Sequence, residues 1–314
     1  MEVLYLFLGF VIIIFFSNVL VDAASSLALK LKIPKMLIAL TIVAFGTCAP
    51  ELAISFQSVA SQNGEMAFAN VIGSCIVNVF LIIGLASFIR PIKVKHMTIK
   101  KELPILLIVT TGFSILMLDS LFNPLTANTF SRADGIILLL LFSLFVLYLV
   151  QMLFKRNSVQ EEVKIKYSPI LAIFLLILSI VFITFSSDLI VENAEIIAHN
   201  FGISDKIITM FAIVIGTSLP ELFMTITSAT KGEFDIAIGN IIGTNIFNIC
   251  IVLGLPIILY GDILLTGFNF IDILAVFLSS FFLFLFARSE KTIDTKEALI
   301  LLFCFILYYI YICF

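Results

Sequence analysis

Two short motifs place a glutamate next to a proline within apolar stretches of this sequence. The first is GTCAPEL, from Gly46 to Leu52, and the second is GTSLPEL, from Gly216 to Leu222. A carboxylate at the centre of a membrane helix costs about 2.5–3.5 kcal/mol on insertion scales. Glu51 and Glu221 therefore both need something that offsets this cost.

Oxygen-bearing side chains accompany both glutamates at intervals of three or four residues, which places them on one face of a helix. Carboxylate, hydroxyl, amide and carbonyl oxygens are the hard ligands that suit calcium, which takes about 6–8 of them. Two protonated acids that merely join helices would leave the other polar side chains unexplained. The stripes comprise Thr47, Glu51, Ser55, Ser58, Gln62, Asn70, Ser74 and Asn78, and Thr217, Glu221, Thr225, Ser228, Asn240, Thr244 and Asn248.

The prolines of the two motifs, Pro50 and Pro220, suit such a site. Proline has no N–H and collides with the carbonyl one turn earlier. We therefore expect carbonyls near Ala44 to Gly46 and near Val214 to Gly216 to lose their helical partners. Free carbonyls at membrane depth are tolerated only where they line a cavity or bind an ion.

The composition indicates a membrane protein. Of 314 residues, 61% are hydrophobic and only 12% are charged, and the net charge of −3 gives no basic surface for nucleic acid. The five cysteines lack metal-binding spacing, and no cofactor is predicted. We expect an all-α polytopic protein in the lipid bilayer, with ten transmembrane helices at about 3–28, 36–61, 66–89, 103–119, 134–154, 168–198, 205–230, 235–260, 268–287 and 297–313.

The basic residues predict the orientation. Sixteen of the 18 Lys and Arg fall in the odd-numbered loops, and only Arg132 and Lys206 fall in the even-numbered ones. Under the positive-inside rule the odd loops are cytoplasmic, so both termini are expected to be extracytoplasmic. The longest loop, 155–167, is too short for a folded domain.

The second motif belongs to an internal repeat. A shift of 170 residues aligns 41–85 with 211–255, and 14 of these 45 positions are identical. Each half, 1–154 and 168–314, holds five predicted spans. Because five is odd, the second five-helix repeat is inverted relative to the first, which is an architecture typical of secondary transporters.

The chain resembles the sodium/calcium exchanger family of the calcium/cation antiporter superfamily, in its form without a large regulatory loop. The resemblance is carried by two signature repeats, GTCAPEL through NVIGSCIVN and GTSLPEL through NIIGTNIFN. It implies a plasma-membrane antiporter, not an enzyme, that exchanges Ca²⁺ for Na⁺ by alternating access. The cations would bind at the midplane among spans two, three, seven and eight, while spans one and six move.

The resemblance also implies roles for individual residues. Glu51 and Glu221 would be the central ligands, and Asn78 and Asn248 would complete the central ring. The flanking sodium sites would be lined by Thr47, Ser74, Thr217, Ser218, Thr244 and the carbonyls of Ala44 and Val214. Two positions depart from the family pattern: Cys48 stands where Ser is usual, and Asn248 stands where some members carry Asp.

Three other readings are open. A proton/calcium antiporter is the nearest, but members of that group carry a histidine beside the acidic residue, and neither repeat has one. Intramembrane aspartyl proteases need Tyr-Asp and Gly-x-Gly-Asp motifs, which this sequence lacks. A channel could share an oxygen-lined site. No obligatory protein partner is indicated.

Overall fold

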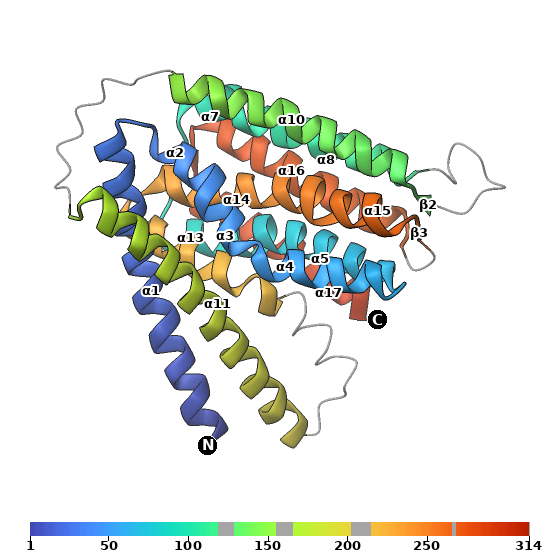
Figure 1. Cartoon of the computed structure of the whole chain (residues 1–314), viewed down its shortest axis with the longest axis horizontal. Helices are drawn as coiled ribbons and strands as arrows, with labels where there is room; N and C mark the ends of the chain where they lie inside the picture. Colours follow the sequence, from blue (N-terminus) through green and yellow to red (C-terminus); the bar gives the residue numbers. More distant parts are fainter. Residues whose placement is uncertain (119–128, 155–165, 202–214, 266–267, 314) are drawn as a thin grey trace.

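The protein is a polytopic membrane protein built of helices (Figure 1). The computed structural model describes residues 1–118, 129–154, 166–201, 215–265 and 268–313. Within these residues, seven helices are long and apolar enough to cross a membrane, and a bent pair of helices adds an eighth. The seven are α1 (Glu2–Leu31), Gly64–Ile89, α10 (Arg132–Phe154), α11 (Pro169–Asn200), Phe234–Tyr260, α16 (Phe270–Ser289) and α17 (Thr295–Cys313).

Within the described residues, two predicted spans form helices shorter than a bilayer requires. Helix α8 (Glu102–Leu116) has 15 residues, and α13 (Leu219–Lys231), the larger described part of the seventh predicted span, has 13. A membrane crossing needs about 20 residues. Helix α13 ends because Gly232 adopts the left-handed conformation, with φ 79°, that terminates many helices. Ten crossings therefore remain a prediction.

The second span is broken at its motif. It contains α2 (Lys35–Ile38), η1 (Ala39–Val43) and α3 (Ala44–Thr47), followed after a 48° bend by α4 (Ala49–Ala60). Cys48 forms the break with a non-helical ψ of 2°, and Ser218 repeats it with a ψ of 3° before α13. Pro50 and Pro220 stand at the first positions of the new helices, where a missing N–H costs little.

The third and eighth spans each contain a wider helical turn. Helix α5 (Gly64–Ile76) continues as the π-helix η2 (Val77–Ile83) and then as α6 (Gly84–Ile89). Helix α14 (Phe234–Phe247) continues as the π-helix η3 (Asn248–Leu253) and then as α15 (Gly254–Tyr260). Such turns are frequent at functional sites. Asn78 and Asn248 both lie where their π-helix begins.

Two short strand pairs, which the sequence analysis did not predict, link the halves. Strand β1 (Ile92–Lys93) pairs with β4 (Thr292–Ile293), and β2 (Thr129–Phe130) pairs with β3 (Ile263–Leu264), both antiparallel. In each pair, one strand comes from either half of the chain. Strands β1 and β3 lie about 170 residues apart in sequence, as the repeat requires, whereas β2 and β4 do not follow this period.

Side chains at equivalent positions of the two halves touch each other. The hydroxyls of Thr110 and Ser280, 170 residues apart, are 3.0 Å from each other. Asn245 Nδ2 donates to the carbonyl of Cys75, also 170 residues away. Equivalent residues can meet in this way only near an axis that relates the halves. These contacts support the predicted repeat, whose inversion remains a prediction.

Helices α1 and α11 lie side by side and project beyond the other helices (Figure 1). Phe16 and Phe182 stack between them, with ring centroids 4.4 Å apart. The buried side chains of α1 and α11 form their own apolar cluster with parts of α2, η1, α13 and α14. The remaining helices share a second, larger core. The two long helices are thus packed separately from most of the molecule.

Candidate cation-binding site

Two glutamates from opposite halves of the chain, Glu51 in α4 and Glu221 in α13, lie near each other in the interior. Both side chains are fully buried, and the two carboxylates interact electrostatically. Their oxygens have no hydrogen-bond partner within the described part of the chain. A buried carboxylate must be paired with a cation or neutralised. The pair therefore marks a place where a cation would be stabilised.

The position of each glutamate in its helix favours its negative charge. Glu51 lies in the first turn of α4, and Glu221 lies in the first turn of α13. The amino-terminal end of a helix carries partial positive charge, which stabilises an anion by about 0.3–1 kcal/mol. The helix breaks at Cys48 and Ser218 therefore place two helix ends inside the protein, each beside its glutamate.

Each motif completes the surroundings of the other's glutamate. Thr217 lies beside the Glu51 carboxylate, and Thr47 lies beside that of Glu221. Thr217 also contacts Asn70 Oδ1 at 3.5 Å, and Asn70 Nδ2 donates to the backbone carbonyl of Glu51 at 3.4 Å. The two halves thus form one shared site instead of two separate ones.

Further polar atoms of the predicted stripes are buried without a partner in the described chain. An unsatisfied buried polar group costs about 1–3 kcal/mol, so a native protein keeps such groups only for a reason. Within the part of the chain that the structure describes, no group of three or more His, Cys, Asp or Glu is arranged to hold a metal. A cation bound here would therefore need hydroxyl and amide oxygens as ligands in addition to the two carboxylates. The atoms of the stripes are Ser55 Oγ, Ser74 Oγ, Asn78 Oδ1, Asn240 Oδ1, Thr244 Oγ1 and both amide atoms of Asn248, and Ser218 Oγ, beside Thr217, is buried in the same way.

Cys48 belongs to this cluster. It is fully buried, interacts electrostatically with both glutamates, and its Sγ lies 4.0 Å from the carbonyl of Thr244. Its counterpart Ser218 is buried as well, with a hydroxyl that lacks a partner among the residues described. The two halves therefore present sulfur at one position and oxygen at the equivalent one.

The expected loss of a helical partner at Ala44 is wrong. Its carbonyl accepts from the Cys48 N–H at 3.1 Å, because the helix breaks only after Thr47. A carbonyl oxygen has a second lone pair, so its role as a sodium ligand remains a prediction. Val214, predicted to act in the same way, lies outside the described residues.

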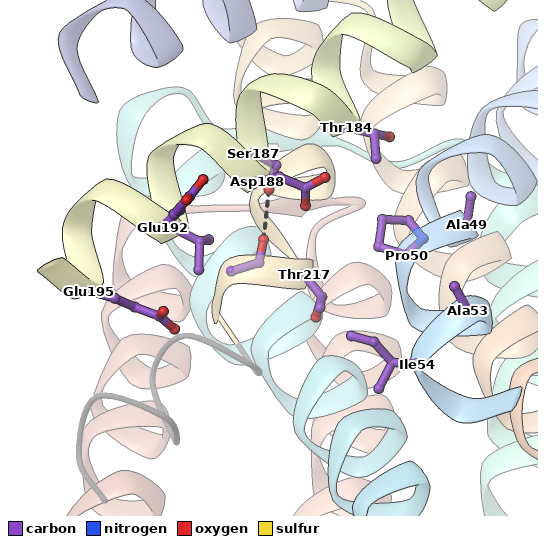
Figure 2. A pocket seen from close by; sticks show the side chains of 12 residues that line it. Ala49, Pro50, Ala53, Ile54, Thr184, Ser187, Asp188, Glu192, Glu195 and Thr217 are labelled. Carbon is purple, nitrogen blue, oxygen red and sulfur yellow. Dashed lines mark hydrogen bonds between the residues drawn. The ribbon is translucent and has the colours of Figure 1, made fainter. Parts of the chain in front are cut away.

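A cavity of about 630 Å³ reaches both motifs (Figure 2). One wall comes from α11, and the other comes from Pro50 and its neighbours in α4. Pro220 has no N–H and cannot donate to the carbonyl of Gly216, four residues earlier. That carbonyl instead accepts from Ser187 Oγ at 2.8 Å, so it has lost its helical partner as predicted. The lining residues include Thr217 and three acids of α11, namely Asp188, Glu192 and Glu195.

The equivalent region of the first half is bridged by ion pairs. Asp22, which corresponds to Glu192 in the repeat, is paired with Lys231 at 2.6 Å and with Lys166 at 2.8 Å. Lys231 also donates to the carbonyl of Asn18 at 2.8 Å, which ties α1 to the end of α13. The hydrogen bond to Asp22 raises the pKa of Lys166, so this pair remains charged at neutral pH. The equivalent acids of the two halves therefore differ in their surroundings: Asp22 is paired with two lysines, whereas Glu192 lines a cavity.

Sequence reasoning missed one residue of the site, Asn245. It is buried beside Thr244, accepts from Asn78 Nδ2 at 2.9 Å, and donates to the Cys75 carbonyl at 3.4 Å. It directly follows Thr244 and therefore falls outside the spacing of three and four residues by which the other polar side chains were identified. The repeat alignment could have indicated Asn245, because it places this buried amide opposite Cys75, and such a difference between the halves marks a residue with a role in only one of them.

Comparisons with known proteins identify the family of the chain. The family model described as "Sodium/calcium exchanger protein" matches residues 1–151 and 171–314. The chain is 36% identical over 261 residues to inner membrane protein YrbG of Escherichia coli, with 80% of this chain and 78% of YrbG covered. It is 30% identical over 289 residues to sodium/calcium exchanger MaX1 of Methanosarcina acetivorans, with 82% and 83% covered.

The fold is also similar to a solved exchanger structure. The sodium-calcium exchanger NCX_Mj matches with a TM-score of 0.82 and 27% sequence identity, over 98% of this chain and 97% of that one. The relatives whose names state an activity are transporters and not enzymes. With both halves of the chain inside the family model, this integral membrane protein belongs to the sodium/calcium exchanger family of antiporters.

Proposed function

We propose that the protein exchanges Ca²⁺ for Na⁺ across the membrane by alternating access. The observation that carries this proposal is the pair of buried carboxylates, Glu51 and Glu221, whose oxygens lack partners in the described chain. Hydroxyl and amide oxygens from α5, α14 and the two π-helices supplement them. This oxygen set fits Ca²⁺, which takes about 6–8 oxygen ligands, and it also fits the hard cation Na⁺.

The charge of the site accounts for competition between the two ions. Two ionised glutamates give an empty site a charge of about −2, which one Ca²⁺ or two Na⁺ would neutralise. One bound Ca²⁺ or two bound Na⁺ would therefore stabilise the same state of the protein, the one in which the helices move. A third Na⁺ would leave net positive charge and make transport sensitive to voltage, at about 2.3 kcal/mol per charge per 100 mV.

The proposed architecture has ten spans in two inverted halves, 1–154 and 168–314, joined by 155–167. The contacts between residues 170 apart, such as Thr110 with Ser280, support it. By the distribution of Lys and Arg, we place both termini on the extracytoplasmic side. A location in the cell membrane is supported by the relative named an inner membrane protein.

Movement of α1 and α11 against the other helices would alternate access. Their separate apolar packing supports this idea, because few core contacts would have to be rebuilt. The cavity beside α11 would be the route to the extracytoplasmic side, and the Asp22 ion pairs would close the cytoplasmic side.

Opening of the closed side is expected when the Asp22–Lys231 pair is removed. Lys231→Gln should increase labelling of Ser17→Cys, a fully buried position on α1, by a membrane-impermeant maleimide about fivefold. Lys95→Gln is the matched control, because Lys95 pairs with Asp235 but does not touch α1. Equal labelling with and without Lys231 would contradict the closing role.

Unequal sodium binding by the two halves is expected from Cys48 and Ser218. A hydroxyl is a better ligand for a hard cation than a thiol, so Cys48→Ser should lower the sodium concentration for half-maximal exchange severalfold. The reciprocal change, Ser218→Cys, should raise it. Sodium dependence of calcium efflux measures both variants, and a shift in the same direction for the two would exclude equivalent roles.

The identity of the counter-ion separates the proposal from its nearest alternative, a proton/calcium antiporter. In proteoliposomes, an outward sodium gradient should drive calcium uptake against its own gradient. A pH gradient without sodium should not. Calcium uptake that is driven by the pH gradient and indifferent to sodium would overturn the proposal in favour of proton coupling.

A further inference from the structure

We infer that Asn245 is a positioning residue that fixes the Asn78 amide with its oxygen toward the bound cation. The inference rests on the proposed function, because it assigns a role in that same site. Asn245 lies in α14 directly after Thr244, and its side chain is 1% exposed. It does not itself need to touch the cation.

The orientation is set by a relay of hydrogen bonds that begins at the backbone. The carbonyl of Cys75 can only accept, so Asn245 must turn Nδ2 toward it, at 3.4 Å. Asn245 Oδ1 then faces the other way and accepts from Asn78 Nδ2 at 2.9 Å. With its nitrogen committed, Asn78 presents Oδ1 on its other side.

The result of this relay is an oxygen prepared for a cation. Asn78 Oδ1 is buried and has no partner among the residues described. An amide that presented its NH₂ group here would repel a cation, whereas the oxygen is a hard ligand. Fixing the amide before binding removes the cost of ordering it during binding.

The second half lacks the equivalent relay. The counterpart of Asn245 is Cys75, whose thiol cannot donate and accept as an amide does. Both amide atoms of Asn248 are buried without a partner in the described chain. The amide of Asn78 is thus oriented before a cation binds, whereas the amide of Asn248 is oriented only by the cation. The two central asparagines therefore contribute unequally to cation binding.

Equilibrium binding of Ca²⁺ to the purified full-length chain tests the inference. Asn245→Ala is expected to raise the calcium concentration for half-saturation about tenfold, while the number of ions bound at saturation is unchanged. In an Asn78→Asp background the same substitution should have little effect. A carboxylate has two oxygens, so it presents one in either orientation.

A purely structural role predicts a different outcome, namely the same loss of affinity in both backgrounds, and that result would overturn the inference. Asn245→Leu, which retains the side-chain volume, provides the same comparison if the alanine variant does not fold. Thr110→Val is the matched control, since it removes a buried hydrogen bond to Ser280 and should lower only the melting temperature. A wild-type chain that binds no Ca²⁺ would overturn the proposed function itself.

Discussion

Exchange of Ca²⁺ for Na⁺ is expected to fall by about 100-fold or more when either Glu51 or Glu221 is replaced by glutamine. Removal of a buried charge that is paired with an opposite one, here a carboxylate with the bound cation, costs about 2–5 kcal/mol, and each 1.4 kcal/mol is a factor of ten. Both carboxylates are fully buried and lack other partners in the described chain, so no neighbour can substitute for the lost charge. Sodium-driven calcium uptake into proteoliposomes measures the effect.

The control for this experiment is a third buried carboxylate. Glu102 in α8 is 1% exposed, accepts a hydrogen bond from the hydroxyl of Tyr148, and lies outside both motifs. Glutamine at this position can accept the same bond, so Glu102→Gln should retain exchange. A variant of Glu51 or Glu221 that keeps the wild-type rate would show that the two acids do not share one site.

A second large effect is expected at Gly243, where α14 crosses η1 and α3. A Cβ added there would lie 2.8 Å from Ala44 Cβ and 2.9 Å from the backbone of Leu40. Neither neighbour can move aside alone, because backbone atoms are involved. Gly243→Leu should therefore separate these helices, with a loss of about 1–3 kcal/mol in stability and of most exchange activity, since Thr244 and Ala44 would move apart.

The melting temperature and calcium affinity of purified Gly243→Leu measure this prediction. Gly112→Ala provides the comparison, because its added Cβ would meet only the end of the flexible Leu141 side chain, at 3.2 Å. A Gly243→Leu protein with wild-type stability and affinity would contradict close packing at this crossing.

The sequence predicted the buried polar cluster because its chemistry is local. Pro50 and Glu51 are neighbours in the chain, so a helix break and a buried acid could be expected at one place, and the repeat identified their counterparts. The spacing of three and four residues then indicated which polar side chains share the buried face. The structure agrees, since Ser55, Ser228 and the other stripe residues named there are buried, apart from Gln62 and the partly buried Thr217.

The sequence could not predict the difference between the halves. Asp22 and Glu192 occupy equivalent positions, yet one is paired with two lysines and the other lines an open cavity. Under the proposed alternating access this asymmetry would belong to one conformational state, and a repeated sequence is compatible with either arrangement. The pairing partners Lys231 and Lys166 have no counterparts of the same type in the repeat alignment, and they become neighbours of Asp22 only in the folded chain.

Contacts between distant segments were also beyond sequence reasoning. The pairing of β1 with β4 joins strands of two residues each, which are too short to have a recognisable pattern. The role of Asn245 depends on two hydrogen bonds to residues about 170 positions away. Such contacts follow from how the halves pack together, and composition or spacing does not reveal them.

The most direct test of the account is equilibrium binding of radioactive calcium to the purified protein, with sodium as competitor. A single cation site shared by the two halves should bind one calcium ion per chain in the wild type, and sodium should displace this ion with a steep concentration dependence. Both Glu51→Gln and Glu221→Gln should abolish this binding. Calcium binding that persists at full stoichiometry and unchanged affinity in either variant would contradict a single cation site shared by the two halves.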